Sequence, residues 1–196
     1  EQRLTHTLVE QTAQRIVDSS HLLLTAAAWT YWNSEFTAIG LALLWVYLCR
    51  YQYFTRFRNT ILLANVLGLI GYLVMPTAPP WMFPYEGFVD GVDHSSGLVH
   101  ALANPYAAMP SLHAADALIV GWMLASACRH RWAKALWALW PAWVWFCVMA
   151  TANHFLLDVV AGILVALFSI AVVTWMPRLV RRYRGSPDSE PIANLL

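Results

Sequence analysis

Residues 151–176, with the sequence TANHFLLDVVAGILVALFSIAVVTWM, decide the fold of this chain. After the polar start, the stretch contains a single charged side chain, Asp158, among aliphatic and aromatic residues. A helix needs about 20 predominantly apolar residues to cross the hydrocarbon core of a membrane. The stretch therefore predicts a membrane-spanning helix over residues 154–176 that carries one acid inside it.

The rest of the chain repeats this pattern. Of its 196 residues, 59% are hydrophobic, only 12% are charged and eleven are tryptophans, which is not the composition of a soluble domain. A weaker stretch over residues 21–32 is too short to span alone and indicates a re-entrant or interfacial segment, although with Ile16 and Val17 it could just span. The sequence predicts an all-α fold, a polytopic membrane bundle of five to six transmembrane helices. The other predicted spans cover residues 36–54, 59–75, 110–128 and 132–151.

The basic residues alternate with the spans in a way that predicts the orientation. Of the twelve Lys and Arg residues, only Arg3 and Arg15 lie outside three clusters, and the positive-inside rule places such clusters in the cytoplasm. Residues 76–109 contain no Lys or Arg and carry acidic side chains, so we expect this loop outside. We therefore expect an integral protein of the plasma membrane with a cytoplasmic C-terminus. The clusters are Arg50, Arg56 and Arg58; Arg129, Arg131 and Lys134; and Arg178, Arg181, Arg182 and Arg184.

The chain divides into three predicted segments. Residues 1–20 have apolar side chains near helical spacing and predict an amphipathic helix at the membrane surface. Residues 21–176 form the predicted transmembrane domain, and residues 177–196 a cytoplasmic tail. Five spans with the C-terminus inside leave the N-terminus outside, and the chain opens on Glu1, which is consistent with the loss of an upstream span. The proline-rich and aromatic loop over residues 76–109 is expected to act as a lid. We expect no disulfide, because Cys49, Cys128 and Cys147 lie in or at the ends of apolar spans.

The span over residues 110–128 begins with an unusual group of residues. Pro110 suits the first position of a helix, where its missing N–H costs nothing, and Ser111 can bond to the first turn. The helix is therefore expected to start at about Met109. This start places His113 within one turn of the outer end of the span.

A second histidine is predicted at the same depth. The last span also runs from outside to inside, so it begins with His154, and Asp158 follows one turn deeper on the same face. Ionisable groups inside a bilayer cost about a few kcal/mol or more unless they line a polar cavity, so they usually serve a function. Asp158 can orient His154 as a nucleophile, while a protonated His113 can donate to a leaving oxygen. The outward N-termini of the two helices favour an anion such as phosphate between them.

These residues resemble the motifs of the type 2 phosphatidic acid phosphatase superfamily of membrane lipid phosphatases and phosphotransferases. Its P-S-x-H motif matches Pro110, Ser111 and His113, and its H-x-x-x-D motif matches His154 and Asp158. The resemblance implies a covalent phosphohistidine on His154 and general acid catalysis by His113. It also implies that the protein uses no metal and no other cofactor.

The resemblance extends over residues 31–176 and points to one branch of the family. The segment PTAPPW at residues 76–81, with PSLH in place of PSGH, resembles the inositol phosphorylceramide synthase-like branch. The serine and arginine that precede the third-motif histidine in many members are replaced by Cys147 and Val148. The usual phosphate-binding arginine is therefore absent, as it is in the phosphotransferase-like branch.

Several other polar residues are candidates for binding substrate. Asp116 follows His113 by three residues, and two interpretations stay open: a hydrogen bond to a neighbouring span, or a role at the site in which it holds His113 protonated. Asn104 and Asn153 could contact a head group or stabilise their own loops. Glu35 is a candidate for binding an acceptor. The predicted substrate-binding set consists of Ser111, Pro110, Asn104, Asn153 and Asp116.

The leading hypothesis is a membrane enzyme that breaks a phosphoester or phosphoanhydride bond of a lipid on the extracytoplasmic face. His154 attacks phosphorus, Asp158 steadies the imidazolium and His113 protonates the leaving group. With water as acceptor the enzyme is a phosphatase, and with an inositol-like or sugar hydroxyl it is a phosphotransferase. The expected substrate is a phospholipid, a polyprenyl phosphate or a sphingolipid-like lipid, and no nucleic-acid partner is expected.

Two other functions are alternatives. The acids and histidines inside the spans could form a proton or lipid path in a transporter. The inner halves of the spans over residues 110–128 and 154–176 are nearly all apolar, however, so such a path would end inside the membrane. The missing arginine is the reason to consider a catalytically inactive scaffold of the same fold.

Overall fold

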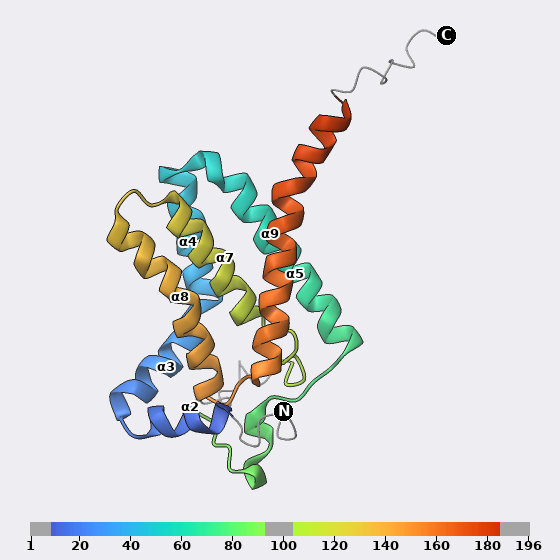
Figure 1. Cartoon of the computed structure of the whole chain (residues 1–196). Helices are drawn as coiled ribbons and strands as arrows, with labels where there is room; N and C mark the ends of the chain where they lie inside the picture. The colour runs from blue at the N-terminus through green and yellow to red at the C-terminus, as the bar shows by residue number, and fades with distance from the viewer. Residues whose placement is uncertain (1–8, 93–103, 185–196) are drawn as a thin grey trace.

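The computed structural model describes residues 9–92 and 104–184, with side chains up to Met176. This part of the chain is helical, which confirms the predicted all-α class (Figure 1). The connection after α5 forms two short 3₁₀ turns, η1 (Pro80–Met82) and η2 (Pro84–Glu86). The α-helices are α2 (Val9–Asp18), α3 (His21–Ser34), α4 (Phe36–Cys49), α5 (Tyr51–Val74), α7 (Leu112–Ala127), α8 (Arg131–Ala150) and α9 (Leu156–Arg184).

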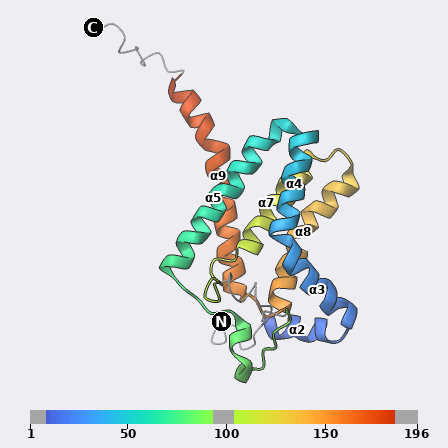
Figure 2. The ribbon, with the colours of Figure 1, turned by 180° about the vertical axis from the view of Figure 1, so that it is seen from behind.

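The central element of the bundle is α7, which contacts α3, α4, α5, α8 and α9. Figures 1 and 2 show it inside the bundle from both sides. Its sequence is apolar around most of its circumference, and a helix of this kind is stable only when other helices enclose it. Ile119 and Val120 are completely buried, and Met123 is nearly so. The 16-residue length of α7 is therefore compatible with a position in the core.

The predicted spans agree with the helices in number more closely than in length. Among the described residues, three helices are long and apolar enough to cross a membrane: α5, α8 and the part of α9 from Leu156 to Met176. The two other predicted spans form the shorter apolar helices α4 and α7. The weak stretch over residues 21–32 becomes α3, which continues into α4 after a break at Glu35. The backbone of α9 extends to Arg184, beyond the predicted end of the last span at residue 176.

The predicted connection between the first two spans is wrong. The chain turns within one residue, because α4 ends at Cys49 and α5 begins at Tyr51. Arg56 and Arg58 consequently lie on the early turns of α5. Arg50 stabilises this corner by donating from Nε to the carbonyl of Ala127 at 3.0 Å, which ties it to the end of α7.

The two ends of the bundle differ in composition, as the charge pattern predicts. The α4–α5 corner, the α7–α8 connection and the late part of α9 lie at one end, and they carry the basic clusters (Figure 1). The opposite end contains α2, the 3₁₀ turns and the first residues of α7 and α9 (Figure 1). The candidate site residues His113 and His154 are found at this second end.

Helix α2 fastens the loop that follows α5. Gln14 Nε2 donates to the carbonyl of Val89 at 2.5 Å, and the amide of Val89 donates back to Gln14 Oε1 at 3.3 Å. Gln11 Nε2 donates to the carbonyl of Glu86 at 2.7 Å. On its other face, α2 packs Val17 against α8. The predicted interfacial helix is therefore packed against the protein over residues 9–18, while residues 1–8 and 93–103 lie outside the described residues.

The loop in turn covers the start of α9. The amide of Trp81 donates to the carbonyl of Ala152 at 2.9 Å. Phe83 and Phe88 surround Phe155, with ring centroids 6.3 and 5.8 Å from it. The described part of the predicted lid thus packs on the turn that precedes α9.

The closest approach of α9 to α7 requires a glycine. A Cβ atom at Gly162 would collide with the carbonyl oxygen of Ser111. A Cβ at Gly40 on α4 would meet nothing within 4 Å. Gly162 therefore permits the contact that brings the first turns of the two helices together.

We predict that Gly162→Ala destabilises the protein by about 1–3 kcal/mol, because the backbone of Ser111 must shift to admit the methyl group. Gly40→Ala, which adds the same atom in open space, is the control and is expected to melt like the unmodified protein. Thermal unfolding of the detergent-purified variants measures the difference. Equal melting temperatures for the two variants would contradict the close packing of α7 on α9.

Candidate active site

His154 lies in a tight turn between α8 and α9. The amides of Asn153 and His154 both donate to the carbonyl of Val148, at 3.0 and 3.1 Å. Ala152 adopts a left-handed conformation with φ 57°, which costs about 1–2 kcal/mol for a residue with a Cβ. Asn153 Nδ2 donates to Thr151 Oγ1 at 2.9 Å, so its amide stabilises the turn. The turn fixes the backbone from which the His154 imidazole projects.

Two carboxylates occupy the N-terminus of α9. Asp158 Oδ2 accepts from the amide of Phe155 at 2.8 Å, in the reciprocal half of a capping box. Glu10, on α2, accepts from the amide of Leu156 at 2.6 Å. The prediction that N–H groups here are free to hold an anion is therefore wrong for these two residues. The sequence analysis did not identify Glu10 as a residue at this end of the bundle, because only the tertiary fold brings α2 to the start of α9.

Asp158 also lies beside His154, as predicted. Its Oδ2 atom is 3.7 Å from His154 Nδ1, and both side chains are only 6% exposed. This distance suits an ion pair and is longer than a hydrogen bond. Nδ1 is buried and has no hydrogen-bond partner among the described residues. The imidazole of His154 thus has a carboxylate next to one of its nitrogens.

His113 approaches this pair from α7. The helix begins at Leu112, with Ser111 as its N-cap accepting from the amide of Ala114 at 3.2 Å. Pro110 precedes the cap, so the prediction that it occupies the first helical position at a start near Met109 is wrong. The amide of Ser111 donates to the carbonyl of Asp158 at 3.0 Å. This bond joins the two helix starts directly.

The two histidines face each other across this junction. The ring centroids of His113 and His154 are 5.8 Å apart, with the planes inclined by 55°. His113 Nε2 lies 3.4 Å from Glu35 Oε2, and the ring stacks on Tyr31 with centroids 4.5 Å apart. The sequence analysis named Glu35 as a candidate for binding an acceptor and not as a partner of His113. Its spacing of four residues from Tyr31 was the available signal.

Asp116 is engaged elsewhere. Both of its carboxylate oxygens lie close to Asn65 Nδ2 of α5, at 3.1 and 3.2 Å. The side chain is completely buried. Within the described part of the chain, the carboxylate at ion-pair distance from His113 is that of Glu35 and not that of Asp116. Of the two open interpretations, the structure thus supports the hydrogen bond to a neighbouring span.

The remaining candidates make hydrogen bonds to nearby backbone groups or pack against a neighbouring helix. Asn104 is exposed, and its Oδ1 accepts from the amide of Tyr106 at 3.0 Å, which forms a local turn. Pro110 is buried against Gly71 of α5. Within residues 9–92 and 104–176, no group of three or more His, Cys, Asp or Glu side chains is arranged to hold a metal ion.

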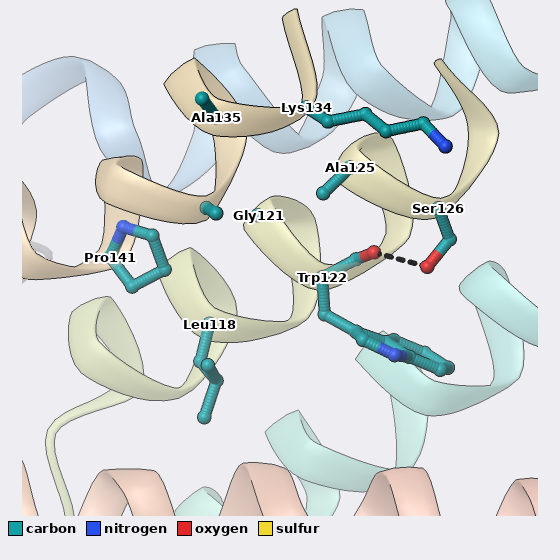
Figure 3. A pocket seen from close by; sticks show the side chains of 9 residues that line it. Leu118, Gly121, Trp122, Ala125, Ser126, Lys134, Ala135 and Pro141 are labelled. Atoms are coloured by element: carbon teal, nitrogen blue, oxygen red, sulfur yellow. Dashed lines mark hydrogen bonds between the residues drawn. The ribbon is translucent and has the colours of Figure 1, made fainter. Parts of the chain in front are cut away.

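A cavity of about 550 Å³ between α7 and α8 is separate from this site. Figure 3 shows Lys134 reaching over it from α8, with Trp122 and Ser126 on the side of α7. It contains none of the predicted site residues, and Lys134 is its one ionisable side chain. The cavity therefore does not change the choice of the histidine pair as the candidate site. Its lining residues are Leu118, Gly121, Trp122, Ala125, Ser126, Lys134, Ala135, Ala138 and Pro141.

Comparison with known proteins gives three results. The family pattern of the PAP2 superfamily matches residues 2–172. Phosphoinositol dihydroceramide synthase of Bacteroides thetaiotaomicron is 31% identical over 142 residues, which cover 63% of this chain and 45% of that protein. The chain therefore spans less than half the length of this relative. The crystal structure of Aquifex aeolicus LpxE has a similar fold, with a TM-score of 0.64 and 17% identity over 84% of this chain and 93% of that one.

We predict that Asp116→Asn keeps the fold and retains activity within a few-fold, because the amide oxygen still accepts from Asn65. Asp116→Leu removes both acceptors and is expected to destabilise the protein by about 1–3 kcal/mol. Thermal unfolding and turnover of the two variants test the structural role. A large loss of turnover in Asp116→Asn without a change in melting temperature would instead indicate a direct role in the reaction.

We predict that Glu10→Ala destabilises the protein by about 1 kcal/mol, because the amide of Leu156 loses its cap. Asp18→Asn, a change on an exposed acid of the same helix, is the control. Hydrogen exchange of the first turn of α9 should accelerate in Glu10→Ala and stay unchanged in Asp18→Asn. Unchanged exchange in both variants would show that Glu10 does not hold this turn.

Proposed function

Because this chain belongs to the PAP2 superfamily, we propose that it is an integral membrane enzyme that transfers a phosphoryl-containing group from a lipid. The relatives in this superfamily support a phosphatase or phosphotransferase, and the family resemblance drawn from the motifs is confirmed. The observation that carries the proposal is the pair of imidazoles, His113 and His154, held 5.8 Å apart at one end of the bundle.

The proposed reaction has two halves. Nε2 of His154 attacks phosphorus in line, so that a P–N bond forms while the P–O bond to the leaving group breaks, and His113 gives its proton to the departing oxygen. An acceptor hydroxyl then gives its proton to His113 and attacks the phosphohistidine, which releases His154. Asp158 stabilises the imidazolium from the side of Nδ1, where its Oδ2 atom lies 3.7 Å away.

The charges of the site favour a phosphodiester as substrate. Ion pairs in the described part of the site join histidines to the carboxylates Glu35 and Asp158 and involve no lysine or arginine. Glu10 adds a third buried acid at the start of α9. A phosphomonoester carries up to two negative charges, whereas a diester carries one. Two histidines surrounded by carboxylates therefore suit the monoanion better.

Transfer to an alcohol is the proposed outcome. The phosphoinositol dihydroceramide synthase relative supports a phosphorylated head group and a ceramide-like or inositol-like alcohol as reactants. His154 is 5% exposed, and the loop residues Phe83 and Phe88 pack on its neighbour Phe155, an environment that limits the access of water. We further propose that the site faces the extracytoplasmic side, because the basic clusters lie at the other end of the bundle.

The packing of the core disfavours a transporter. Beyond Asp116 toward the basic end, α7 continues with the buried apolar residues Ile119, Val120 and Met123. A proton or lipid path would need polar groups at these depths. The side chains of His113, His154 and Asp158 instead lie together at one end, which is the arrangement of a reaction site.

We predict that the protein forms a phosphohistidine and that His154→Ala abolishes it and lowers turnover by at least about a thousandfold, because the nucleophile is removed. Purified protein is incubated with a labelled panel of phospholipids, polyprenyl phosphates and ceramide, with and without inositol. Acid-labile label on the protein, released phosphate and new phospholipid are followed together.

The control is His130→Ala, which removes an exposed histidine at the opposite end of the bundle and should behave like the unmodified protein. New phospholipid without released phosphate or phosphorylated head group supports transfer. Release of either one without new phospholipid supports hydrolysis, because hydrolysis of a diester gives a phosphorylated alcohol. Equal turnover in His154→Ala and in the unmodified protein would overturn the mechanism. No turnover of any member of the panel would favour the inactive scaffold.

A further inference from the structure

Three contacts hold the ring of His113, and all come from the end of α3. The ring of Tyr31 stacks on it with centroids 4.5 Å apart and planes 14° from parallel. His113 Nε2 donates to the carbonyl of Tyr31 at 3.2 Å. The same Nε2 atom lies 3.4 Å from Glu35 Oε2. Glu35 is the residue between α3 and α4, so the break in the helix places its carboxylate at the site.

These contacts assign different tasks to the two ring nitrogens. A carbonyl oxygen only accepts hydrogen bonds, so the contact with Tyr31 requires a proton on Nε2. Both the carbonyl and the carboxylate lie at Nε2, which leaves Nδ1 as the nitrogen for the reaction. A proton on Nδ1 as well makes the ring an imidazolium, and a carboxylate beside Nε2 favours that form.

We propose that Glu35 is the positioning carboxylate of His113, forming a second histidine–carboxylate pair opposite His154 and Asp158. This inference rests on the proposed function, because it gives His113 the part of general acid. Glu35 fixes the ring and keeps it doubly protonated, so that the proton on Nδ1 passes to the departing oxygen. When the acceptor attacks, its proton returns to Nδ1, and Glu35 again stabilises the cation.

His113 and Glu35 are both largely buried, so the charge of each strongly affects the other. The side chains of His113 and Glu35 are 12% and 20% exposed. An imidazolium with so little water around it needs a nearby negative charge, and the histidine opposite, His154, is a competing cation when protonated. The negative charge of Glu35 acts against both effects. Asp158 cannot do so for His113, because it lies against the other ring.

Other titratable groups surround the pair from each neighbouring helix. They are tyrosines, belong to the opposite pair or are bonded elsewhere. Tyr31 lies on α3 and His154 faces the ring from the start of α9. Asp116, on the next turn of α7, accepts a hydrogen bond from Asn65 of α5, and Tyr72 lies on α5 near Leu112. Asp90 lies in the loop after α5, where its Oδ1 accepts from the amide of Val92.

The experiment compares pH profiles of kcat/KM for Glu35→Gln, Glu35→Asp and the unmodified protein on the substrate found with the panel. In Glu35→Gln, kcat should fall about tenfold to a hundredfold with little change in KM, because part of the general acid effect is lost. The alkaline limb of the profile should move to lower pH by about one unit or more, since the imidazolium loses its neighbouring carboxylate. Glu35→Asp should restore the limb toward its original position.

Two controls separate positioning from simple structural damage. Glu86→Gln makes the same change on an exposed acid at this end of the bundle and should leave the profile unchanged. In a His113→Ala background, Glu35→Gln should have no further effect on kcat, because Glu35 acts through His113. A structural role would instead give additive losses and no movement of the alkaline limb.

The outcomes distinguish this inference from the proposed function. An unmoved alkaline limb in Glu35→Gln, in a protein whose turnover still depends on His154, overturns the role of Glu35 and leaves the function standing. A change confined to KM for the alcohol acceptor also overturns it, because it would make Glu35 an acceptor-binding residue. Turnover that survives His154→Ala overturns the proposed mechanism itself.

Discussion

The hydrogen bond from the amide of Ser111 to the carbonyl of Asp158 is the contact on which the candidate site depends. It joins the start of α7 to the first turn of α9, at a point where both backbones leave the apolar bundle. The absence of a Cβ on Gly162 allows the two chains to come this close. Because each helix carries one histidine near this point, the bond also sets the distance between the two imidazoles.

The polar groups of the site form a connected system. Asp158 caps the backbone of its own helix and lies beside His154, while Glu10 caps the same helix from α2. Glu35 and Tyr31 hold His113 from α3. In a largely apolar bundle, these groups must find partners within the protein, since unpartnered polar groups are costly there. Asp158 therefore serves both structural capping and the proposed chemistry.

Local sequence patterns were sufficient for the presence of the apolar helices and for the spacing of the motif residues. Hydropathy located the apolar helices, and a spacing of four residues placed His154 and Asp158 on one face. The errors occurred where local signals compete. Pro110 fits the first position of a helix, yet Ser111 provides the cap that starts α7. Arg56 and Arg58 suggest a loop, yet they lie in α5, because arginine is a good helix former.

The sequence alone determined that the chain forms apolar helices, that its basic residues gather at one end and that two histidines and an aspartate lie near helix starts at the other. These properties follow from composition and from the period of the helix. Only the tertiary structure decided which carboxylate serves which imidazole. Glu10, Glu35 and Asp116 are all acids in or near apolar segments, and nothing in their local sequence separates them. Their partners, Leu156, His113 and Asn65, belong to other helices, and the packing of those helices is the physical reason for their different tasks.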